Sequence, residues 1–270
     1  MPELPEVETT RRGLEPHLVG ARIAAFDVRE ARLRWPVPAE LVERLVGQRV
    51  SAIRRRSKYL LIDVDGGSAL VHLGMSGSLR FDAEADPRRT HDHLQLRLET
   101  GLLLRYNDPR RFGCWLWQPA GETHPLLSRL GPEPFSEDFD ANRLWRLSRG
   151  RQSAVKNFLM DPAIVVGVGN IYASEALFRA GIDPRRAAGR VALARYQRLA
   201  EVVRTVLGEA IDQGGTTLRD FLRPQGTPGY FAQSLNVYDR AGAACRRCAT
   251  PIRRVVLGQR ASFYCPQCQR

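Results

Sequence analysis

Polar and apolar residues alternate over much of the first half of the chain, which is the pattern of β-strands with one buried face. Ahead of these strands, residues 5–18 predict a helix, since Pro5 is suited to a first helical turn. From about residue 21 to residue 117 the pattern is mostly that of strands, with hairpins expected to turn at 65–67 and 100–101. One helix followed by many short strands predicts an all-β sandwich or barrel.

The pattern changes near residues 130–134, where a glycine and two prolines are typical of a linker. Beyond this point the periodicity is helical, and the predicted helices are separated by Asp-Pro and glycine-rich turns. We expect these helices at residues 153–160, 171–180 and 191–213. The stretch 165–170, VVGVGN, predicts a glycine turn that leads into a helix, whereas residues 214–233 are typical of a loop.

Composition and length are those of a globular protein with one or two domains, at 270 residues, 43% hydrophobic and 26% charged. The sequence has no run of about 18 apolar residues, so no membrane helix is expected. The first residues, MPELPEVETTRRG, are charged throughout and lack the apolar core of a signal peptide. We therefore expect an intracellular protein with no membrane partner.

The chain is strongly basic, with a formal net charge of +12 and a pI near 10.2. Such a charge favours a polyanionic partner, above all nucleic acid, although a merely basic soluble surface is the alternative. Only two of the 41 basic residues are lysines, Lys58 and Lys156, a bias typical of a GC-rich genome. A lysine can lose its proton and an arginine cannot, so both lysines are candidates for positions where the two residues are not interchangeable.

Two cysteine pairs lie close to the carboxyl end. Cys245 and Cys248 are separated by two residues, as are Cys265 and Cys268, and sixteen residues lie between the pairs. This is the spacing of a four-cysteine zinc site, while the alternative, disulfide bonds, is rare inside cells. Four protein ligands leave no open position on the metal, so we predict one structural Zn²⁺ that holds a hairpin turning at residues 257–259.

The amino end offers a nucleophile. Met1 is normally removed before a proline, which leaves the secondary amine of Pro2 at the terminus. The positive end of a helix dipole disfavours the protonated amine, and a neutral amine can attack a sugar or carbonyl carbon to form an imine-type intermediate. Glu3 or Glu6 could deliver a proton to the departing or ring oxygen. The alternative is ordinary capping, because proline and acidic residues are common in a first helical turn.

Several motifs follow one another in an order that spans essentially the whole chain. They are PELPEVETTRRGL, KYLLID, HLGMSGSLR, NDPRRFG, GVGNIYASEALFRAGI, GGTTLRDF, PGYF and the cysteine hairpin. With these motifs the sequence resembles the formamidopyrimidine-DNA glycosylase family. The segments PELPEVET and GNIYASE are the most specific of them.

The resemblance implies an α+β multidomain fold. Its parts would be a catalytic β-sandwich domain with flanking helices at residues 1–131, a helix-two-turn-helix DNA-binding domain at 132–235 and a zinc finger at 236–270. It also implies a bifunctional enzyme of base excision repair that excises oxidised purines, such as 8-oxoguanine and formamidopyrimidines, and then cleaves the abasic site by β- and δ-elimination. The expected partner is duplex DNA with such a lesion or an abasic site, bound by a monomer in the bacterial cytoplasm, at the nucleoid.

The resemblance also assigns catalytic roles to positions of this chain. Pro2 corresponds to the nucleophile that attacks C1′ of the deoxyribose, and Glu3 to the proton donor for the sugar ring oxygen. Glu6 corresponds to a supporting carboxylate. Lys58 corresponds to the lysine that transfers protons in β-elimination and contacts phosphate. Arg260 corresponds to the residue that assists δ-elimination and also suits a phosphate contact.

Other positions match DNA-contacting residues of the family. An enzyme that takes a base out of the stack must fill the gap, and the matching residues are Met75, Arg110 and Phe112. Without the resemblance, Met75 and Phe112 would be assigned to the core, although both lie in glycine-rich turns. Contacts to phosphate or sugar are expected from His72, His91, Arg151, Lys156 and Asn170. The loop at 217–230 corresponds to the segment that covers the flipped base.

Two departures from the family pattern are small. Position 151 is arginine rather than lysine, which phosphate binding tolerates, and Cys114 stands where a small residue is common. We expect Cys114 to be a buried packing residue. Two other functions stay open: an endonuclease VIII-type glycosylase for oxidised pyrimidines, and a zinc-containing DNA-binding protein without catalysis.

Overall fold

The computed structural model describes residues 2–215 and 234–270. The chain divides into two compact units, Met1–Ser128 with Gln213–Ala232, and Arg129–Asp212 with Gln233–Arg270. The loop expected at 217–230 lies outside the described residues. The domain boundaries that we placed at residues 131 and 235 stay predictions.

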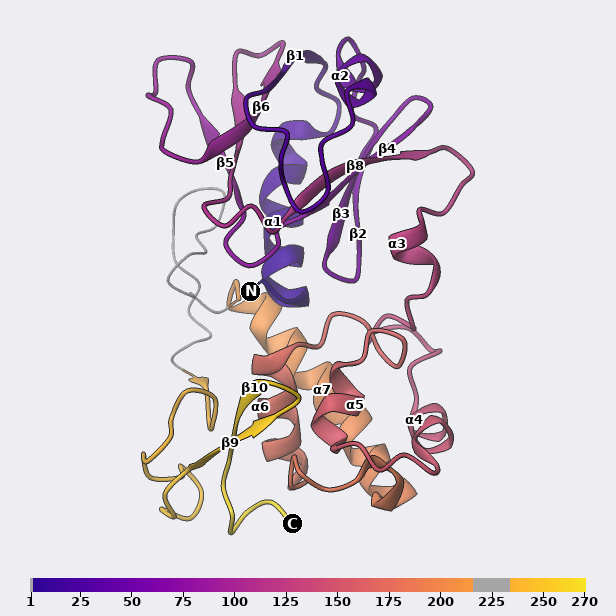
Figure 1. The fold of residues 1–270 in the computed structure, drawn as a ribbon, viewed down its shortest axis with the longest axis vertical. Coiled ribbons are helices and arrows are strands. Elements are labelled where there is room, and N and C mark those ends of the chain that lie inside the picture. Colours follow the sequence, from indigo (N-terminus) through magenta and orange to yellow (C-terminus); the bar gives the residue numbers. More distant parts are fainter. Residues whose placement is uncertain (1, 216–233) are drawn as a thin grey trace. The chain divides into compact units, whose positions relative to one another are not determined.

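The first unit opens with helix α1, Leu4–Leu18, which confirms the helix expected at 5–18 (Figure 1). Glu3 is its N-cap, and Pro5 lies in its first turn, where the missing backbone N–H costs nothing. Two further helices in this unit, α2 at Glu40–Leu45 and α3 at Pro125–Ser128, were not predicted. In α2 only Leu41 and Leu45 are buried, so its apolar pattern is too short to be recognised in the sequence.

Two four-stranded antiparallel sheets form the body of the first unit. One sheet has the order β1, β6, β7, β5, with bounds Ile23–Val28, Asp92–Leu98, Leu103–Asn107 and Ser78–Asp82. The other has the order β2, β3, β4, β8, with bounds Ala52–Arg56, Tyr59–Val64, Gly67–His72 and Cys114–Pro119. The predicted hairpins are confirmed as β3–β4 and β6–β7.

The core of this unit lies where the two sheets and α1 pack together. The inward positions alternate along the strands, as Leu94, Leu96 and Leu98 do on β6, and all three are at most 1% exposed. Leu14 and Leu18 of α1 belong to the same cluster and are fully buried. This burial of apolar surface explains why the alternating pattern in the sequence identified the sandwich.

The second unit is helical. Its helices are α4 at Ala141–Ser148, α5 at Val155–Met160, α6 at Asn170–Ala180 and α7 at Leu193–Asp212, with a short 3₁₀ helix, η1, at Ala188–Arg190. Three of them confirm the helices expected at 153–160, 171–180 and 191–213. Helix α4 was not predicted, although Asp140 caps it by accepting a hydrogen bond from the backbone N–H of Arg143.

A two-stranded hairpin follows in the same unit, with β9 at Arg253–Leu257 and β10 at Arg260–Tyr264. Its two-residue turn consists of Gly258 and Gln259, with φ of 53° and 63°, as a type I′ turn requires. The turn predicted at 257–259 is therefore confirmed. Within the part of the chain that the structure describes, no helix combines the length and the apolar character needed to cross a membrane.

Candidate active site

The first turn of α1 places Pro2, Glu3 and Glu6 together, and all three are buried. The backbone N–H of Glu3 donates to Oε2 of Glu6 at 2.8 Å, and the Glu3 side chain accepts from the Glu6 backbone in return. This reciprocal capping box fixes the direction in which the chain enters the helix. Pro2 comes directly before the cap, so its nitrogen lies at the positive end of the helix dipole.

Gly215 approaches this turn closely. A Cβ atom at Gly215 would lie 3.0 Å from Oε1 of Glu6, and the backbone at this glycine has φ of +79°. Both the contact and the left-handed conformation favour glycine at this position. The carboxylate of Glu6 is therefore confined between its own helix cap and a second backbone segment of the same unit.

Lys58 lies on the two-residue turn between β2 and β3, where Arg56 pairs with Tyr59. The turn's first residue, Ser57, is 4% exposed and has φ of 57°. Tyr59 in turn pairs with His72 of β4, and their rings lie 4.8 Å apart. The structure thus places Lys58 near His72.

His72 is uncharged at neutral pH. Burial, together with the nearby charges of Lys58 and Arg34, lowers its pKa to about 4. Its Nδ1 atom accepts a hydrogen bond from the backbone N–H of Gly74 at 3.0 Å, so Nε2 carries the proton of the neutral ring. His72 can act as a neutral hydrogen-bonding group but not as a cation.

Asp108 joins two loops that carry the expected intercalating residues. Its fully buried carboxylate accepts hydrogen bonds from the hydroxyls of Ser76 and Tyr106, at 2.7 and 3.0 Å, and from the backbone N–H of Gly113 at 2.9 Å. The hydroxyl of Ser76 accepts in addition from the backbone N–H of Arg110, at 3.2 Å. The turn after β4 and the loop before β8 are therefore tied to one buried charge.

Met75, Arg110 and Phe112 project from these two loops. Met75 is 38% exposed and Phe112 is 42% exposed, so both apolar side chains are accessible to a binding partner. The guanidinium of Arg110 lies 4.7 Å from the centre of the Phe112 ring. A Cβ at Gly74 would lie 2.4 Å from the Phe112 backbone, so only glycine allows the loops to come this close.

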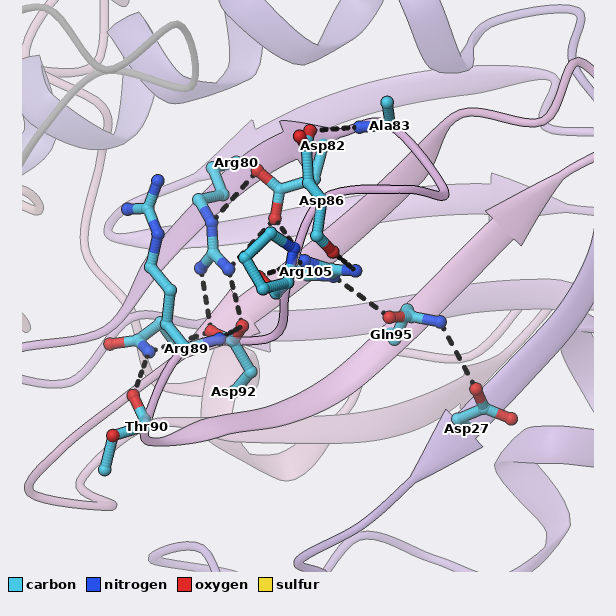
Figure 2. A network of polar contacts seen from close by, with 12 residues as sticks. Asp27, Arg80, Asp82, Ala83, Asp86, Arg89, Thr90, Asp92, Gln95 and Arg105 are labelled. Atoms are coloured by element: carbon cyan, nitrogen blue, oxygen red, sulfur yellow. Dashed lines mark hydrogen bonds and ion pairs between the residues drawn. The ribbon is translucent and has the colours of Figure 1, made fainter.

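His91 is exposed at the end of the loop between β5 and β6, with φ of 71°. The loop backbone is held by a buried polar network (Figure 2). Arg105 donates to the carbonyls of Asp86 and Pro87 at 2.8 and 3.0 Å, and Asp92 accepts from the backbone N–H of Arg89 at 2.8 Å. The position of His91 is therefore set by side chains of the sheet below.

Arg80 and Asp92 form the centre of this network. Two nitrogens of Arg80 donate to the two oxygens of Asp92, at 2.7 and 2.5 Å. Burial alone would raise the pKa of Asp92, but the hydrogen bonds from Arg80 and Asn107 outweigh it, and this pKa lies below its usual range. Asp82 also binds both Arg80 and Arg105 at 2.9 Å, so the buried charges are paired.

In the second unit, Lys156 and Asn170 meet around β10. Lys156 is 1% exposed, and its Nζ donates to Oδ1 of Asn170 at 2.6 Å and to the Ser262 hydroxyl at 2.7 Å. Asn170 is the first residue of α6, and its amide donates to the carbonyl of Ala261 at 3.0 Å. The predicted glycine turn before this helix is confirmed, since Gly169 is its N-cap.

Arg151 and Arg260 are exposed residues of the second unit. Arg151 donates to the carbonyl of Leu147 at 3.0 Å and lies 3.7 Å from Asp161. Arg260 is the first residue of β10, directly after the turn. Both guanidinium groups are accessible to an anion, as phosphate binding requires.

The four cysteines of the tail form a metal site. Their Sγ atoms all lie within 4.8 Å of one another, with separations of 3.9 Å from Cys245 to Cys268 and 3.5 Å from Cys248 to Cys265. A tetrahedral zinc ion with Zn–S bonds of about 2.3 Å needs sulfur atoms about 3.8 Å apart. The four thiolates therefore fit a closed structural zinc site, as the spacing predicted.

Cys114 is the remaining cysteine and is completely buried. Burial raises the pKa of its thiol to about 12, which keeps it protonated and unreactive. The packing role that the sequence predicted is confirmed.

Glu175 is an important residue that the sequence analysis did not single out. Its buried carboxylate accepts hydrogen bonds from the backbone N–H groups of Asn236, Val237 and Tyr238, at 2.9, 2.8 and 2.9 Å. It thereby attaches the start of the cysteine tail to α6. The only sequence signal was a glutamate within an otherwise apolar stretch of a predicted helix.

Three family models match the chain. The model for the formamidopyrimidine-DNA glycosylase N-terminal domain matches residues 1–115, that for the formamidopyrimidine-DNA glycosylase H2TH domain matches residues 130–222, and that for a zinc finger found in FPG and IleRS matches residues 242–270. Together they account for the sandwich, the helical region and the cysteine hairpin. They confirm the fold class that the sequence predicted.

Individual proteins are similar over the whole chain. A formamidopyrimidine-DNA glycosylase of Stenotrophomonas maltophilia is 60% identical, with 100% of both chains covered. A crystal structure of a Lactococcus lactis FPG mutant with Fapy-dG-containing DNA has a TM-score of 0.93 at 33% identity, with 100% of both chains covered. A structure of MutM with DNA containing carbocyclic 8-oxo-G has a TM-score of 0.92 at 33% identity, again with 100% of both chains covered. On sequence, fold and metal site together, the chain belongs to the formamidopyrimidine-DNA glycosylase family.

Proposed function

We propose that the chain is a bifunctional DNA glycosylase and abasic-site lyase that removes 8-oxoguanine and formamidopyrimidines from duplex DNA. We also propose that the protein acts as a monomer on chromosomal DNA in the cytoplasm. Support comes from its family membership and from the lesions, Fapy-dG and carbocyclic 8-oxo-G, in the DNA of two similar structures. The basic charge of +12 suits a polyanionic substrate.

The first chemical step assigned here is attack by the amine of Pro2 on C1′ of the damaged nucleotide. The nitrogen forms a bond to C1′ while the bond from C1′ to the base breaks, and the base leaves with the proton that the amine of Pro2 loses. Glu3 supplies a proton to the ring oxygen, which opens the sugar and leaves an iminium between Pro2 and C1′. The buried capping box supports this assignment, because it holds both groups at the start of α1.

The second stage is elimination from the iminium. Loss of a proton from C2′ expels the 3′-phosphate. Loss of a proton from C4′ then expels the 5′-phosphate, after which water releases Pro2. We assign the proton transfer of the first elimination to Lys58 and assistance of the second to Arg260. A lysine amine can accept and return a proton near neutral pH, whereas a guanidinium remains charged and suits a departing phosphate.

Recognition of the substrate requires that the base leave the stack. We assign the filling of the vacated space to Met75 and Phe112, and hydrogen bonding of the orphaned base to Arg110. The exposure of both apolar side chains supports this assignment. Phosphate or sugar contacts are proposed for His72, His91, Arg151, Lys156 and Asn170, with His72 acting as a neutral donor.

The observation that carries the proposal is the buried first turn of α1, where an amine and two carboxyl groups meet next to a helix dipole. A panel of duplexes with 8-oxoguanine, a formamidopyrimidine or thymine glycol tests the choice of substrate. We expect excision and strand cleavage to be fastest with the two purine lesions. Preference for thymine glycol would favour an endonuclease VIII-type enzyme, and binding without cleavage would favour a protein without catalysis.

A further inference from the structure

The guanidinium group of Arg55 links the turn that carries Lys58 to α1. Nη1 of Arg55 donates to the carbonyl of Ser57 at 2.9 Å, and Nε of the same side chain contacts Oε2 of Glu8 at 3.2 Å. Arg55 and Glu8 are largely buried, with side chains 12% and 13% exposed. One planar group thus joins a residue of α1 to the residue directly before Lys58.

Glu8 is itself held firmly on α1. Its carboxylate accepts hydrogen bonds from Arg11 at 3.1 to 3.2 Å and from Arg12 at 3.0 Å. Burial would raise the pKa of Glu8, but the hydrogen bonds from Arg11 and Arg12 and the charge of Arg55 keep it below the usual range. The carboxylate is therefore ionised at neutral pH and stays available to Arg55.

Helix α1 begins directly after Pro2 and Glu3, and Glu8 lies just beyond its first turn. A lysine has four rotatable bonds, so its amine reaches a reacting atom reproducibly only if its backbone is fixed. Displacement of a reacting group by about 1 Å can cost about a hundredfold in rate. The link from Glu8 through Arg55 to Ser57 fixes the Lys58 backbone relative to the helix that carries Pro2.

We propose that Arg55, held by Glu8, is a positioning residue for Lys58 in the elimination step. The inference rests on the proposed function, because it takes Lys58 to be the group that transfers the proton. Arg55 would touch neither DNA nor the reacting atoms in this role. Its loss should slow elimination and leave base excision by Pro2 largely intact.

Arg54 provides a matched control. It is the neighbour of Arg55 on β2, and adjacent strand residues point to opposite faces of the sheet. Its guanidinium pairs with Asp63, and its side chain is 57% exposed. Arg54→Gln therefore removes a charge and an ion pair from the same strand without touching the link to the turn.

The test compares Arg55→Gln, Glu8→Gln, Arg54→Gln and Lys58→Ala on a duplex with 8-oxoguanine under single-turnover conditions. Alkali-treated samples report base excision, and untreated samples report elimination. We expect Arg55→Gln and Glu8→Gln to slow elimination by about tenfold or more, with excision and DNA affinity within about twofold of the parent. Arg54→Gln should match the parent in both steps.

The double variant Arg55→Gln with Lys58→Ala separates positioning from an independent effect. If Arg55 acts through Lys58, the double variant should eliminate no more slowly than Lys58→Ala alone. A further loss of tenfold in the double variant, or an Arg55→Gln variant that behaves like Arg54→Gln, would overturn the inference. Thermal unfolding of every variant identifies a loss caused by misfolding, and Arg55→Lys, which cannot bridge both acceptors, replaces Arg55→Gln if that variant does not fold.

Lys58→Ala also separates failure of the inference from failure of the proposed function. Rapid elimination by Lys58→Ala would refute the role of Lys58 and, with it, any positioning by Arg55. Slow elimination by Lys58→Ala together with rapid elimination by Arg55→Gln would refute the positioning role alone.

Discussion

The carboxylate of Glu6 accepts a hydrogen bond from the backbone N–H of Glu3 at 2.8 Å, and the two side chains are 0% and 2% exposed. This contact closes the first turn of α1 immediately after Pro2. Because Gly215 also approaches the Glu6 carboxylate, the geometry of the proposed nucleophile depends on a residue that need not take part in bond making. Glu6 thereby connects the helix cap with the turn that carries the proposed nucleophile.

Glu6→Ala should therefore impair both stability and chemistry. Removal of one side of the capping box is expected to cost about 1 kcal/mol in the free energy of unfolding and to slow base excision at least about tenfold. Glu6→Gln retains an acceptor and should lose less stability. Urea unfolding and single-turnover excision measure the two effects, with Glu15→Ala as the control because Glu15 is exposed on the same helix. Full activity in Glu6→Ala would contradict this account.

Met75→Ala and Phe112→Ala should separate activity from stability. Both side chains are partly exposed, so the free energy of unfolding should change by about 0.5 kcal/mol or less. Excision of 8-oxoguanine should fall more than about tenfold, because nothing fills the space of the extruded base. Val46→Ala is a matched control, since Val46 is 38% exposed, as Met75 is. A large loss of stability with unchanged excision would indicate that both side chains serve in packing and not in DNA binding.

Breaking the pair of Arg80 and Asp92 should destabilise the first unit. Asp92→Asn leaves a buried guanidinium with a weaker partner, and we expect a loss of about 3 kcal/mol in the free energy of unfolding. The loop with His91 should then hold DNA less well, which fluorescence anisotropy with an abasic duplex can measure. Arg32→Gln removes the exposed pair with Glu30 and should leave both quantities unchanged. Equal effects of the two substitutions would contradict the role of the network.

His72 should make stability depend on pH between about 6.5 and 4. Its pKa is about 4 in the folded protein and near 6.5 when unfolded, so the unfolded chain takes up the proton first. The contribution of His72 to the free energy of unfolding is complete above pH 6.5. It falls by roughly 3 kcal/mol in total as the pH is lowered toward 4. His72→Gln keeps an acceptor for the Gly74 N–H, and its stability should lack this dependence on pH. Parallel stability curves for parent and variant over this range would show the prediction to be wrong.

Cys245→Ser or a strong chelator should release the zinc ion and weaken DNA binding. The site supplies four thiolates, and the tail is too small to bury a core of its own beyond a few residues such as Ile252 and Phe263. We expect one zinc per chain by metal analysis and loss of the hairpin's amide protection after chelation. DNA affinity should fall when the zinc ion is removed. Unchanged affinity in the metal-free protein would show that the hairpin is dispensable.

Local patterns explain what the sequence could predict. The β3–β4 hairpin, the glycine turn before Asn170 and the cysteine pairs depend on neighbouring residues, and all three are present in the structure. The capping box at Glu3 and Glu6 also follows from local spacing. Assignment of a catalytic role to these residues, however, came from the resemblance and not from the pattern.

Contacts between distant residues explain what the sequence could not predict. Asp108 binds Ser76, 32 residues away, and Glu175 binds the backbone of Val237, 62 residues away. No spacing rule relates such positions, so the charges that hold the loops and the tail were not recognised. The near-complete burial of Lys156 could not be predicted for the same reason, because its partner Ser262 is 106 residues away along the chain.

Reductive trapping identifies the nucleophile of the proposed reaction. The protein without Met1 is mixed with a duplex that contains 8-oxoguanine in the presence of borohydride, and the cross-linked peptide is mapped by mass spectrometry. We expect a covalent adduct on the nitrogen of Pro2, and we expect it to be lost in Pro2→Gly and in protein that retains Met1. An adduct on a lysine, or no adduct with the damaged duplex, would contradict it.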